Sequence, residues 1–358
     1  MYKSFTARKF RCFENLTIEP LERINLIAGK NNVGKTALLE ALWLHHGYNN
    51  PELGLRIDVF RGLAHIKTDE FLWDLFFDFD HEKPIELSSQ DSDGTSRSLH
   101  IKTRERSTSR LTTRNGKTEL FPVTDTLGQE TTQPTGAEIL FDYYEGTVKS
   151  PVQARAIVEG KDIQFERPAS TRKSLGIFLV ARGIGDPEGF AERFADLEAE
   201  RRKDEIVKIL RIIEPRLEDL TMLYRGGAPL IYGDVGIKRL LPMPLMGDGI
   251  GRLLSLVVAI PQAQDGIVLV DEIENGLHYS VRVDLWKAIA AFTREFNVQL
   301  FATTHSAECI RAAHRAFEEN DQYDFRLHRL ERIRDTIRAV TYDRDTLGAA
   351  LETGLEIR

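Results

Sequence analysis

The chain has 358 residues, of which 42% are hydrophobic and 29% charged, with a net charge of -7 and an isoelectric point of about 5.8. This composition excludes a disordered polymer and indicates one large folded domain or two ordinary ones. The acidic balance also excludes a protein whose whole surface binds nucleic acid, so any DNA contact must come from a local basic patch.

The cysteines and apolar runs of the sequence indicate in which compartment the protein works. Cys12 and Cys309 are too few and too far apart for a disulfide framework, and the sequence has no Cys-x-x-Cys metal knuckle. The N-terminus lacks the apolar run and cleavage site of a signal peptide. The strongest apolar run, LLSLVVAI at 253–260, is far shorter than the roughly 20 residues of a membrane helix. We therefore expect a cytoplasmic protein with no membrane contact.

Residues 23–44, RINLIAGKNNVGKTALLEALWL, predict a strand, a glycine-rich loop and a helix in that order. RINLIAG is short and apolar, as a buried strand should be. Leu38, Leu39, Leu42 and Trp43 follow at helical spacing. The loop between them, GKNNVGKT, fits the pattern G-x-x-x-x-G-K-[ST] and predicts a P-loop.

The residue types of this loop suit the binding of a triphosphate. Backbone N–H groups must turn inward around the phosphates, so glycines are needed where a side chain would obstruct the anion. Lys35 would reach the β- and γ-phosphates, and Thr36 would give its hydroxyl to Mg²⁺. The alternative, a glycine turn followed by a chance Lys-Thr pair, does not explain the flanking strand and helix. The expected nucleotide-binding residues are Gly29, Lys30, Asn31, Asn32, Gly34, Lys35, Thr36 and Ala37.

The middle of the chain predicts an antiparallel insertion. Residues 97–123 alternate in polarity around Asn115-Gly116, a strong hairpin signal. Within them, residues 102–117 hold six basic residues and one acid, which indicates either a DNA contact or a solvated arm. Residues 125–138 are polar and predict a loop. Further strands are expected over 137–146, 160–168 and 174–183.

Residues 187–220 predict a short helical lobe. The spacing of their apolar residues suits two ordinary helices better than a heptad array, and Pro215 interrupts the pattern near its end. The chain therefore has no room for a long coiled-coil arm.

Residues 244–263, PLMGDGIGRLLSLVVAIPQA, predict a glycine-rich turn that opens an apolar helix. Gly247, Asp248, Gly249 and Gly251 lie at the start of this helix, which can bind an anion. The simpler alternative is an ordinary helix start with Asp248 as its N-cap.

Two further strands end in groups that could complete the site. IVLV at 267–270 is followed by Asp271 and Glu272, which could hold Mg²⁺ and orient or deprotonate the attacking water. VQLFATTHS at 298–306 is a second strand, after which His305 could touch the γ-phosphate. The alternatives are solvated acids and a histidine without function. Residues 306–358 are too few for a fused nuclease domain.

These segments, in this order, resemble the ATP-binding-cassette superfamily. They are most similar to its soluble branch, which includes the structural-maintenance-of-chromosomes (SMC) proteins, RecF and the ATPase domains of overcoming-lysogenisation-defect nucleases. GKNNVGKT resembles Walker A, IVLVDE Walker B and GDGIGRLL the signature motif, while ENGLH and TTHS fall at the D-loop and the H-loop. The N-terminal residues resemble the opening hairpin of the branch, with a turn at 10–15. The chain is most similar to short AAA-family ATPases of bacterial defence type that lack a nuclease domain.

The resemblance implies an α/β fold: a P-loop NTPase with an ABC-type ATPase head built on a mixed sheet, an inserted antiparallel arm and a short helical lobe. The expected divisions are an N-terminal lobe of the head at 1–95 and a β insertion at 96–185. A helical lobe at 186–225 and a C-terminal lobe of the head at 226–358 complete the chain.

The resemblance also implies a homodimer that sandwiches two ATP molecules with Mg²⁺. Glu272 would then be the catalytic carboxylate, His305 the γ-phosphate sensor and Lys35 the phosphate-binding cation, while Thr36 and Asp271 would hold the metal. Gly247, Asp248 and Gly249 would contact the partner's ATP. The sequence departs from the family at Gly247, where the signature motif usually has serine. Gln90 and Gln153 are both possible Q-loop residues.

The main functional hypothesis is an ATP-driven dimerising switch that senses phage infection and controls a separately encoded effector, such as a nuclease. A RecF-like DNA-repair accessory is the first alternative. The missing signature serine suggests another, an ATP-binding scaffold with little turnover. A transporter ATPase fits poorly because of the signature and the size of the insertion.

Overall fold

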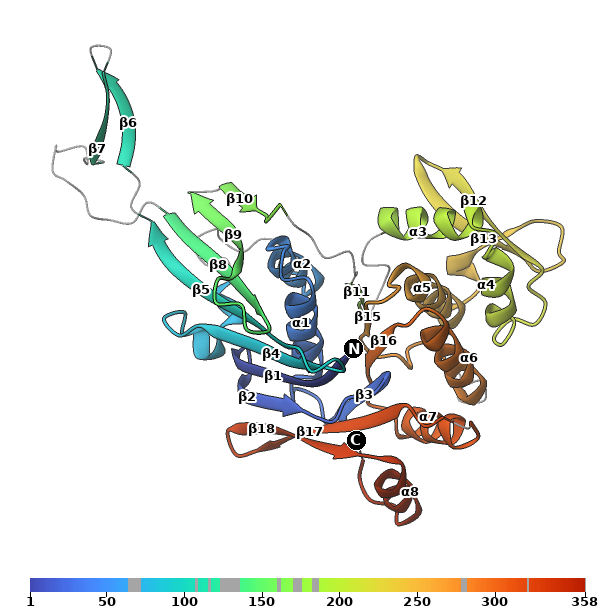
Figure 1. Ribbon diagram of the computed structural model, residues 1–358. Helices are drawn as coiled ribbons and strands as arrows, with labels where there is room; N and C mark the ends of the chain where they lie inside the picture. Colours follow the sequence, from blue (N-terminus) through green and yellow to red (C-terminus); the bar gives the residue numbers. More distant parts are fainter. Residues whose placement is uncertain are drawn as a thin grey trace.

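The computed structural model describes residues 1–63, 72–106, 109–114, 117–122, 136–159, 162–169, 176–181, 187–277, 282–320 and 322–357. Two large sheets dominate this part of the chain, and helices lie between them and on the outer side of the second sheet (Figure 1). No helix in the described ranges is long and apolar enough to cross a membrane.

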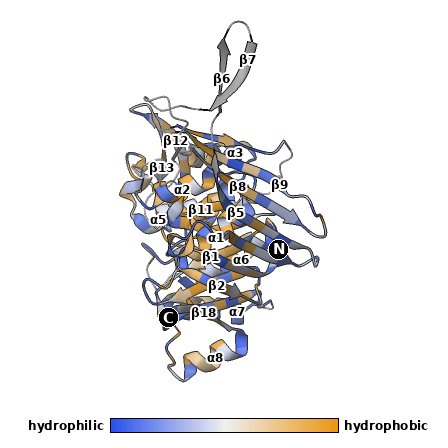
Figure 2. Cartoon of the chain, turned by 90° about the vertical axis from the view of Figure 1, so that its left-hand side faces the viewer, coloured by the Kyte–Doolittle hydropathy of each residue, from blue (hydrophilic) through white to orange (hydrophobic). Residues whose placement is uncertain are grey.

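The first large sheet is antiparallel and has the strand order β10-β9-β8-β5-β4-β1-β2. Its strands are β1 (Tyr2–Phe10), β2 (Phe13–Ile18), β4 (Ile85–Asp91), β5 (Ser96–Arg106), β8 (Gly136–Glu145), β9 (Val152–Glu159) and β10 (Asp162–Glu166). Burial alternates along β4, and in Figure 2 the hydropathy colouring changes between orange and blue along β8 and β9. Such alternation is typical of a sheet with one packed face. The expected opening hairpin is present, because Phe10 pairs with Phe13 across the turn between β1 and β2.

The second large sheet is mixed, as expected, and both ends of the chain build it. Its order is β11 (Gly176–Leu179), β15 (Ile267–Val270), β16 (Gln299–Thr303), β3 (Ile24–Gly29), β17 (Phe325–Ile333) and β18 (Thr336–Tyr342). The first five strands run parallel and β18 is antiparallel to β17. Every residue of β3, β15 and β16 is buried, which explains their continuous apolar runs.

Helices cover both faces of the mixed sheet. They are α1 (Lys35–His46), α2 (Glu52–Phe60), α5 (Asp248–Gln262), α6 (Arg282–Glu295), α7 (Ala307–Glu318) and α8 (Arg344–Glu352). Along β15, Ile267 and Leu269 pack in one core with α1 and the antiparallel sheet, whereas Val268 and Val270 pack in another with α5, α6 and α7. Helix α1 therefore lies between the two sheets, and its first turn faces the ends of the buried strands.

The expected helical lobe is present but shorter than predicted. Helices α3 (Pro187–Ala199) and α4 (Lys203–Leu210) are followed by a small sheet of β12 (Asp219–Arg225), β13 (Ala228–Asp234) and β14 (Leu241–Pro242). The prediction of helix as far as residue 220 is therefore wrong. Apolar residues at 220, 222 and 224 alternate, and pairing with β13 makes this segment a strand.

The predicted arm is a separate two-stranded hairpin that follows β5 in the chain (Figure 1). It consists of β6 (Ser109–Arg114) and β7 (Lys117–Pro122), with Arg114 paired to Lys117. Its predicted turn, Asn115-Gly116, lies outside the described residues, as does most of the loop predicted at 125–138. Strands β8, β10 and β11 occupy the other predicted segments, and β8 to β10 continue the antiparallel sheet of the N-terminal strands. Short 3₁₀ helices complete the chain: η2 (Trp73–Leu75), η3 (Phe77–Phe79) and η4 (Met243–Leu245).

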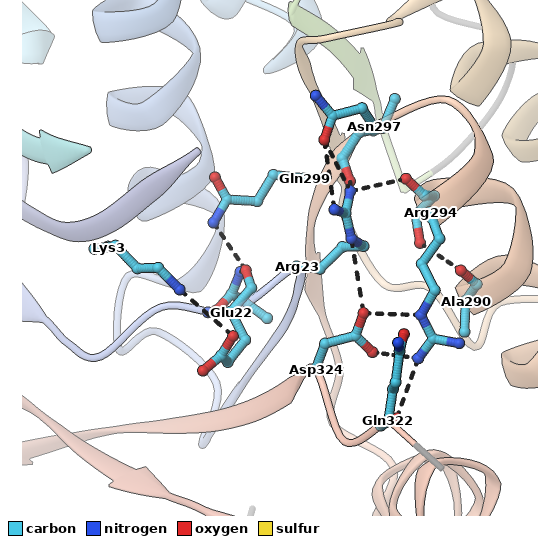
Figure 3. Close-up of polar contacts among 12 residues, drawn as sticks. Lys3, Glu22, Arg23, Ala290, Arg294, Asn297, Gln299, Gln322 and Asp324 are labelled. Atoms are coloured by element: carbon cyan, nitrogen blue, oxygen red, sulfur yellow. Dashed lines mark hydrogen bonds and ion pairs between the residues drawn. The ribbon is translucent and has the colours of Figure 1, made fainter. Parts of the chain in front are cut away.

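Polar contacts hold the edge of the mixed sheet at which β3, β16 and β17 begin (Figure 3). Arg23 lies 3.7 Å from the Asp324 carboxylate, and Arg294 donates to the same carboxylate at 2.9 Å. Gln299 donates to the carbonyl of Glu22 at 2.8 Å. At this edge, side chains and backbone groups of the protein contact one another. The opposite edge, where the parallel strands end, is where open α/β sheets bind ligands.

Candidate nucleotide-binding and catalytic site

The P-loop joins the end of β3 to the start of α1, and two of its positions require glycine. Gly29 has a φ of 141°, and a Cβ there would lie 2.5 Å from the carbonyl oxygen of Leu330. Gly34 has a φ of 88°, and its Cβ would lie 2.6 Å from Cys12 Sγ. A side chain at either position would be strained and would fill the loop. The loop therefore keeps the close backbone curvature that a phosphate cradle needs.

The Lys35 ammonium is held inside this loop. Its side chain turns back so that Nζ donates to the carbonyl oxygens of Gly29 at 2.8 Å and Lys30 at 2.9 Å. Burial lowers the pKa of Lys35, and the nearby carboxylates of Asp271 and Glu272 oppose that shift. The cation thus lies at the start of α1, where it binds two loop carbonyls and is attracted by nearby carboxylates.

The other loop positions lie around this cation. Lys30, Asn31 and Asn32 are exposed at the rim, and Ala37 is buried in the first turn of α1. Asn32 has a φ of 63°, and its carbonyl accepts a hydrogen bond from Arg332 at 3.4 Å. The predicted nucleotide-binding residues thus lie in one loop and in the first turn of α1.

Thr36 and Asp271 meet at the end of β15. The Thr36 hydroxyl lies 3.0 and 3.1 Å from the two carboxylate oxygens of Asp271, and Thr303 donates to the same carboxylate at 2.6 Å. Hydroxyl and carboxylate oxygens are hard ligands of the kind that Mg²⁺ takes. In the described ranges, no group of three or more His, Cys, Asp or Glu could hold a metal. Mg²⁺ typically takes one or two protein ligands together with phosphate and water.

Glu272 lies beside His305 at the neighbouring strand end. The backbone of Glu272 has a φ of 52°, and its N–H donates to the Thr303 hydroxyl at 2.8 Å. Its Oε1 lies 2.8 Å from His305 Nε2, and its Oε2 accepts a hydrogen bond from Asn275 at 2.8 Å. The His305 N–H in turn donates to Glu274 at 2.7 Å. The fold therefore brings the predicted carboxylate and histidine into direct contact.

The predicted signature turn lies next to the turn after Glu272. Gly247 caps α5 with a φ of 102°, so a serine at this position would be strained. The alternative role for Asp248 is wrong, because it is the first helical residue and no side chain caps the helix. A Cβ on Gly249 would lie 2.2 Å from the Gly276 carbonyl oxygen. A cavity of about 700 Å³ separates this helix start from α3 and β13, and Glu272 is among its lining residues.

Two residues that the sequence did not single out contact the site. Arg252 of α5 donates to the carbonyl oxygen of Val180 at 2.5 Å and to that of Asp271. Burial lowers the pKa of Arg252, and the neighbouring carboxylates oppose that shift. The second residue is Asn275, the partner of the Glu272 carboxylate. An arginine within the apolar run of α5 was the available signal for Arg252, whereas Asn275 looked like an ordinary turn residue.

A buried charge network lies behind the P-loop helix. Arg11, at the turn between β1 and β2, lies 2.9 Å from Glu40, 3.6 Å from Asp58 and 2.8 Å from Asp74. Glu40 stands one turn after Thr36 and also accepts from Arg61 at 2.7 Å. Burial raises the pKa of Asp58 to about 7; Asp74 adds to this shift and Arg11 opposes it.

The structure does not bring either candidate Q-loop residue to the site. Gln90 donates to Ser96 at 2.7 Å and Gln153 donates to Asp142 at 2.6 Å, both on the antiparallel sheet. The same carboxylate of Asp142 pairs with Lys102 at 2.7 Å, so the first cation of the basic arm is neutralised. From residue 105 to 117, the side chains of the arm lie outside the described residues.

Comparisons with known proteins identify relatives of this chain. A family model described as "AAA domain" matches residues 4–221, and one described as "AAA domain, putative AbiEii toxin, Type IV TA system" matches residues 150–311. A Helicobacter pylori protein named "ATP/GTP phosphatase" is 23% identical over 341 residues, which are 90% of each chain.

Solved structures with a similar fold are SMC head domains. An SMC head bound to the C-winged helix domain of ScpA has a TM-score of 0.50 at 12% identity, covering 98% of this chain and 99% of the other. The SMC head domain from Thermotoga maritima has a TM-score of 0.47 at 12% identity, covering 96% and 99%. The first likeness shows the fold of an SMC head. With a family model over more than half of its length, the chain belongs to the AAA domain family and is an ATPase.

Proposed function

We propose that the protein is a Mg²⁺-dependent ATPase that uses ATP to close a homodimer and thereby acts as a switch. The observation that carries this proposal is the convergence of Lys35, Thr36, Asp271, Glu272 and His305 at the ends of three adjacent parallel strands. Each group is of the type that phosphoryl transfer to water requires.

The chemistry divides among these side chains. Lys35 would leave its loop carbonyls and bind the β- and γ-phosphates, and the backbone from Gly29 to Ala37 would surround them. Thr36 and Asp271 would hold Mg²⁺, which supplies charge neutralisation at the phosphates. Glu272 would orient the attacking water and accept its proton, while His305 would contact the γ-phosphate. His305 Nε2 lies 2.8 Å from Glu272 Oε1, and this contact supports a shared role for the two residues.

The position of the signature turn supports the proposed dimer. Asp248 and Gly249 lie against the turn at Gly276. Their N–H groups at the start of α5 would therefore serve the ATP of a partner copy. Closure would bury two nucleotides and hydrolysis would release them.

For the biological role, we propose a cytoplasmic regulator of a bacterial anti-phage system that controls a separate effector, such as a nuclease. The description of the second matching family, a putative AbiEii toxin of a type IV toxin–antitoxin system, supports a two-component setting. A RecF-like repair accessory remains the alternative that DNA binding by the arm would favour. A scaffold with little turnover is the alternative that the glycine at position 247 would favour.

The first test is Glu272→Gln, compared with Glu82→Gln on an exposed loop as a control for the same change. General-base catalysis contributes about 10²–10⁴-fold, so we expect a loss of ATP turnover of that size with nucleotide affinity retained. Light scattering after gel filtration should show a dimer with ATP only in the Glu272→Gln variant. Unchanged turnover would overturn the assignment of Glu272 and the proposed reaction at this site.

The second test addresses the partner. Tagged Glu272→Gln protein would be purified from cells that carry its native gene neighbourhood, and what accompanies it would be identified by mass. A stoichiometric protein with nuclease-like chemistry supports the switch. DNA without a partner protein favours the repair alternative.

A further inference from the structure

Asn275 contacts both the proposed catalytic glutamate and the strand that leads to the helical lobe. Its Nδ2 donates to Glu272 Oε2 at 2.8 Å and to the carbonyl oxygen of Ala181 at 3.1 Å. Ala181 is the second residue after the end of β11 and precedes α3 in the chain. One amide group therefore joins the carboxylate to the base of the lobe.

The Glu272 carboxylate needs such a partner to keep one orientation. The terminal torsion of a glutamate side chain is broad, so packing alone does not fix the plane of its two oxygens. His305 approaches Oε1 and Asn275 approaches Oε2, both at 2.8 Å. His305 is the proposed γ-phosphate sensor, so its contact with Oε1 would be lost when it binds a phosphate. The contact of Asn275 with Oε2 does not involve His305 and can persist.

The support for Asn275 comes from a strand end that also braces the signature helix. The carbonyl of Val180 accepts from Arg252 of α5 at 2.5 Å, and the next carbonyl, that of Ala181, accepts from Asn275. Arg252 also binds the carbonyl of Asp271. The end of β11 thus fixes Asn275 and the start of α5 together.

Asn275 and Glu272 also border open space. Both line the cavity of about 700 Å³ between α5, α3 and β13. A substitution at a side chain that borders a cavity disturbs fewer packed neighbours than one in the core. The hydrogen bond to Glu272 can therefore be removed by mutation with little effect on packing.

We propose that Asn275 is a positioning residue, which holds Glu272 in its reactive orientation and is itself held by the carbonyl of Ala181. The inference rests on the proposed function, since it assigns a role toward the proposed catalytic carboxylate. Asn275 touches neither the phosphates nor the water and acts only through Glu272.

Two substitutions test this role. Asn275→Ala removes the hydrogen bond, and the nearly isosteric Asn275→Asp replaces it with a second carboxylate. Misplacement of a reacting group by 1 Å costs up to about 10²-fold, so kcat should fall at least about tenfold in both variants. ATP affinity, measured with a fluorescent nucleotide, should stay within about twofold. Asn15→Asp, on an exposed part of β2, controls for the added charge.

The rate–pH profile separates positioning from a merely structural role. In Asn275→Asp, a carboxylate beside Glu272 disfavours loss of its proton, so the acid limb of the profile should move up by about 1 pH unit or more. Asn275→Ala should leave that limb in place. A profile of Asn275→Asp identical to that of the wild type, or wild-type kcat in both variants, would overturn the inference. If Glu272→Gln retained turnover, the proposed function would fail first, and the two failures are therefore distinguishable.

Discussion

Helix α5 contacts the turn after Glu272 closely at Gly249, so a side chain introduced there should disturb this contact. A Cβ at Gly249 would lie 2.2 Å from the carbonyl oxygen of Gly276 and 3.0 Å from its carbon. Because both atoms belong to backbone, relief requires the start of α5 to move by about 1 Å. Overpacking of this kind costs about 1–3 kcal/mol, against about 1 kcal/mol gained from alanine in a helix. We expect Gly249→Ala to destabilise the protein by up to about 2 kcal/mol.

Gly251→Ala is the matched control. It lies in the same helix, and a Cβ there would meet no atom within 4 Å. Without a clash, the substitution should stabilise the protein by up to about 1 kcal/mol. Thermal unfolding followed by circular dichroism should therefore rank Gly251→Ala at or above the wild type and Gly249→Ala below it.

Catalysis should show the same contrast more strongly. A shift of about 1 Å at the helix start would displace the groups proposed to contact the partner's ATP, so Gly249→Ala should lose about tenfold or more in turnover. Gly251→Ala should stay within about twofold. If Gly249→Ala matched Gly251→Ala in both stability and rate, the close approach of α5 to Gly276 would be wrong.

Three further outcomes are expected. Lys35→Ala should weaken nucleotide binding about 100-fold in a fluorescence titration, since a charge-assisted contact to the phosphates is lost; normal affinity would contradict the assignment of the P-loop. Asp271→Asn should raise the Mg²⁺ concentration for half-maximal turnover about tenfold, with little change in nucleotide binding in EDTA; an unchanged Mg²⁺ dependence would remove Asp271 from the metal site. Asp58→Asn tests the buried network. Burial raises the pKa of Asp58 from 3.8 to about 7, so between these values the folded chain keeps a proton that the unfolded chain has lost. The contribution of Asp58 to the free energy of unfolding is most favourable below pH 4. It falls by about 1.4 kcal/mol for each pH unit up to pH 7. The stability of Asp58→Asn relative to the wild type, from urea unfolding at pH 5, 6 and 7, should therefore rise with that slope; a constant difference would refute the raised pKa.

The nucleotide-binding segments were predictable because their signals are local. In GKNNVGKT, the spacing of Gly29, Gly34, Lys35 and Thr36 specifies a loop between a buried strand and a helix, and the structure has that loop. Asp271 and His305 were recognisable because each follows a short apolar strand. Parallel strands of one sheet end on the same edge, so these residues meet without further information.

Contacts across distant segments were not predictable in this way. Arg252 binds Val180, 72 residues earlier in the chain, and Asn275 binds Ala181, 94 residues earlier. No local pattern reports such partners. The prediction of helix for the segment after α4 was wrong for a different reason. Its alternating apolar residues suit a strand as well as a helix, and pairing with β13 decides between the two.

The place of β3 in the mixed sheet has a consequence for how the protein is made. The strand that carries the P-loop pairs only with β16 and β17 within that sheet, which follow it by about 300 residues of chain. At a synthesis rate of about 5–20 residues per second, the ribosome needs about 15–60 s to deliver those partners. During that interval both edges of an apolar strand lack their final neighbours. A nascent chain is then open to chaperones and to aggregation, and the partner of Thr36 in the phosphate loop, Asp271, lies 235 residues later in the chain.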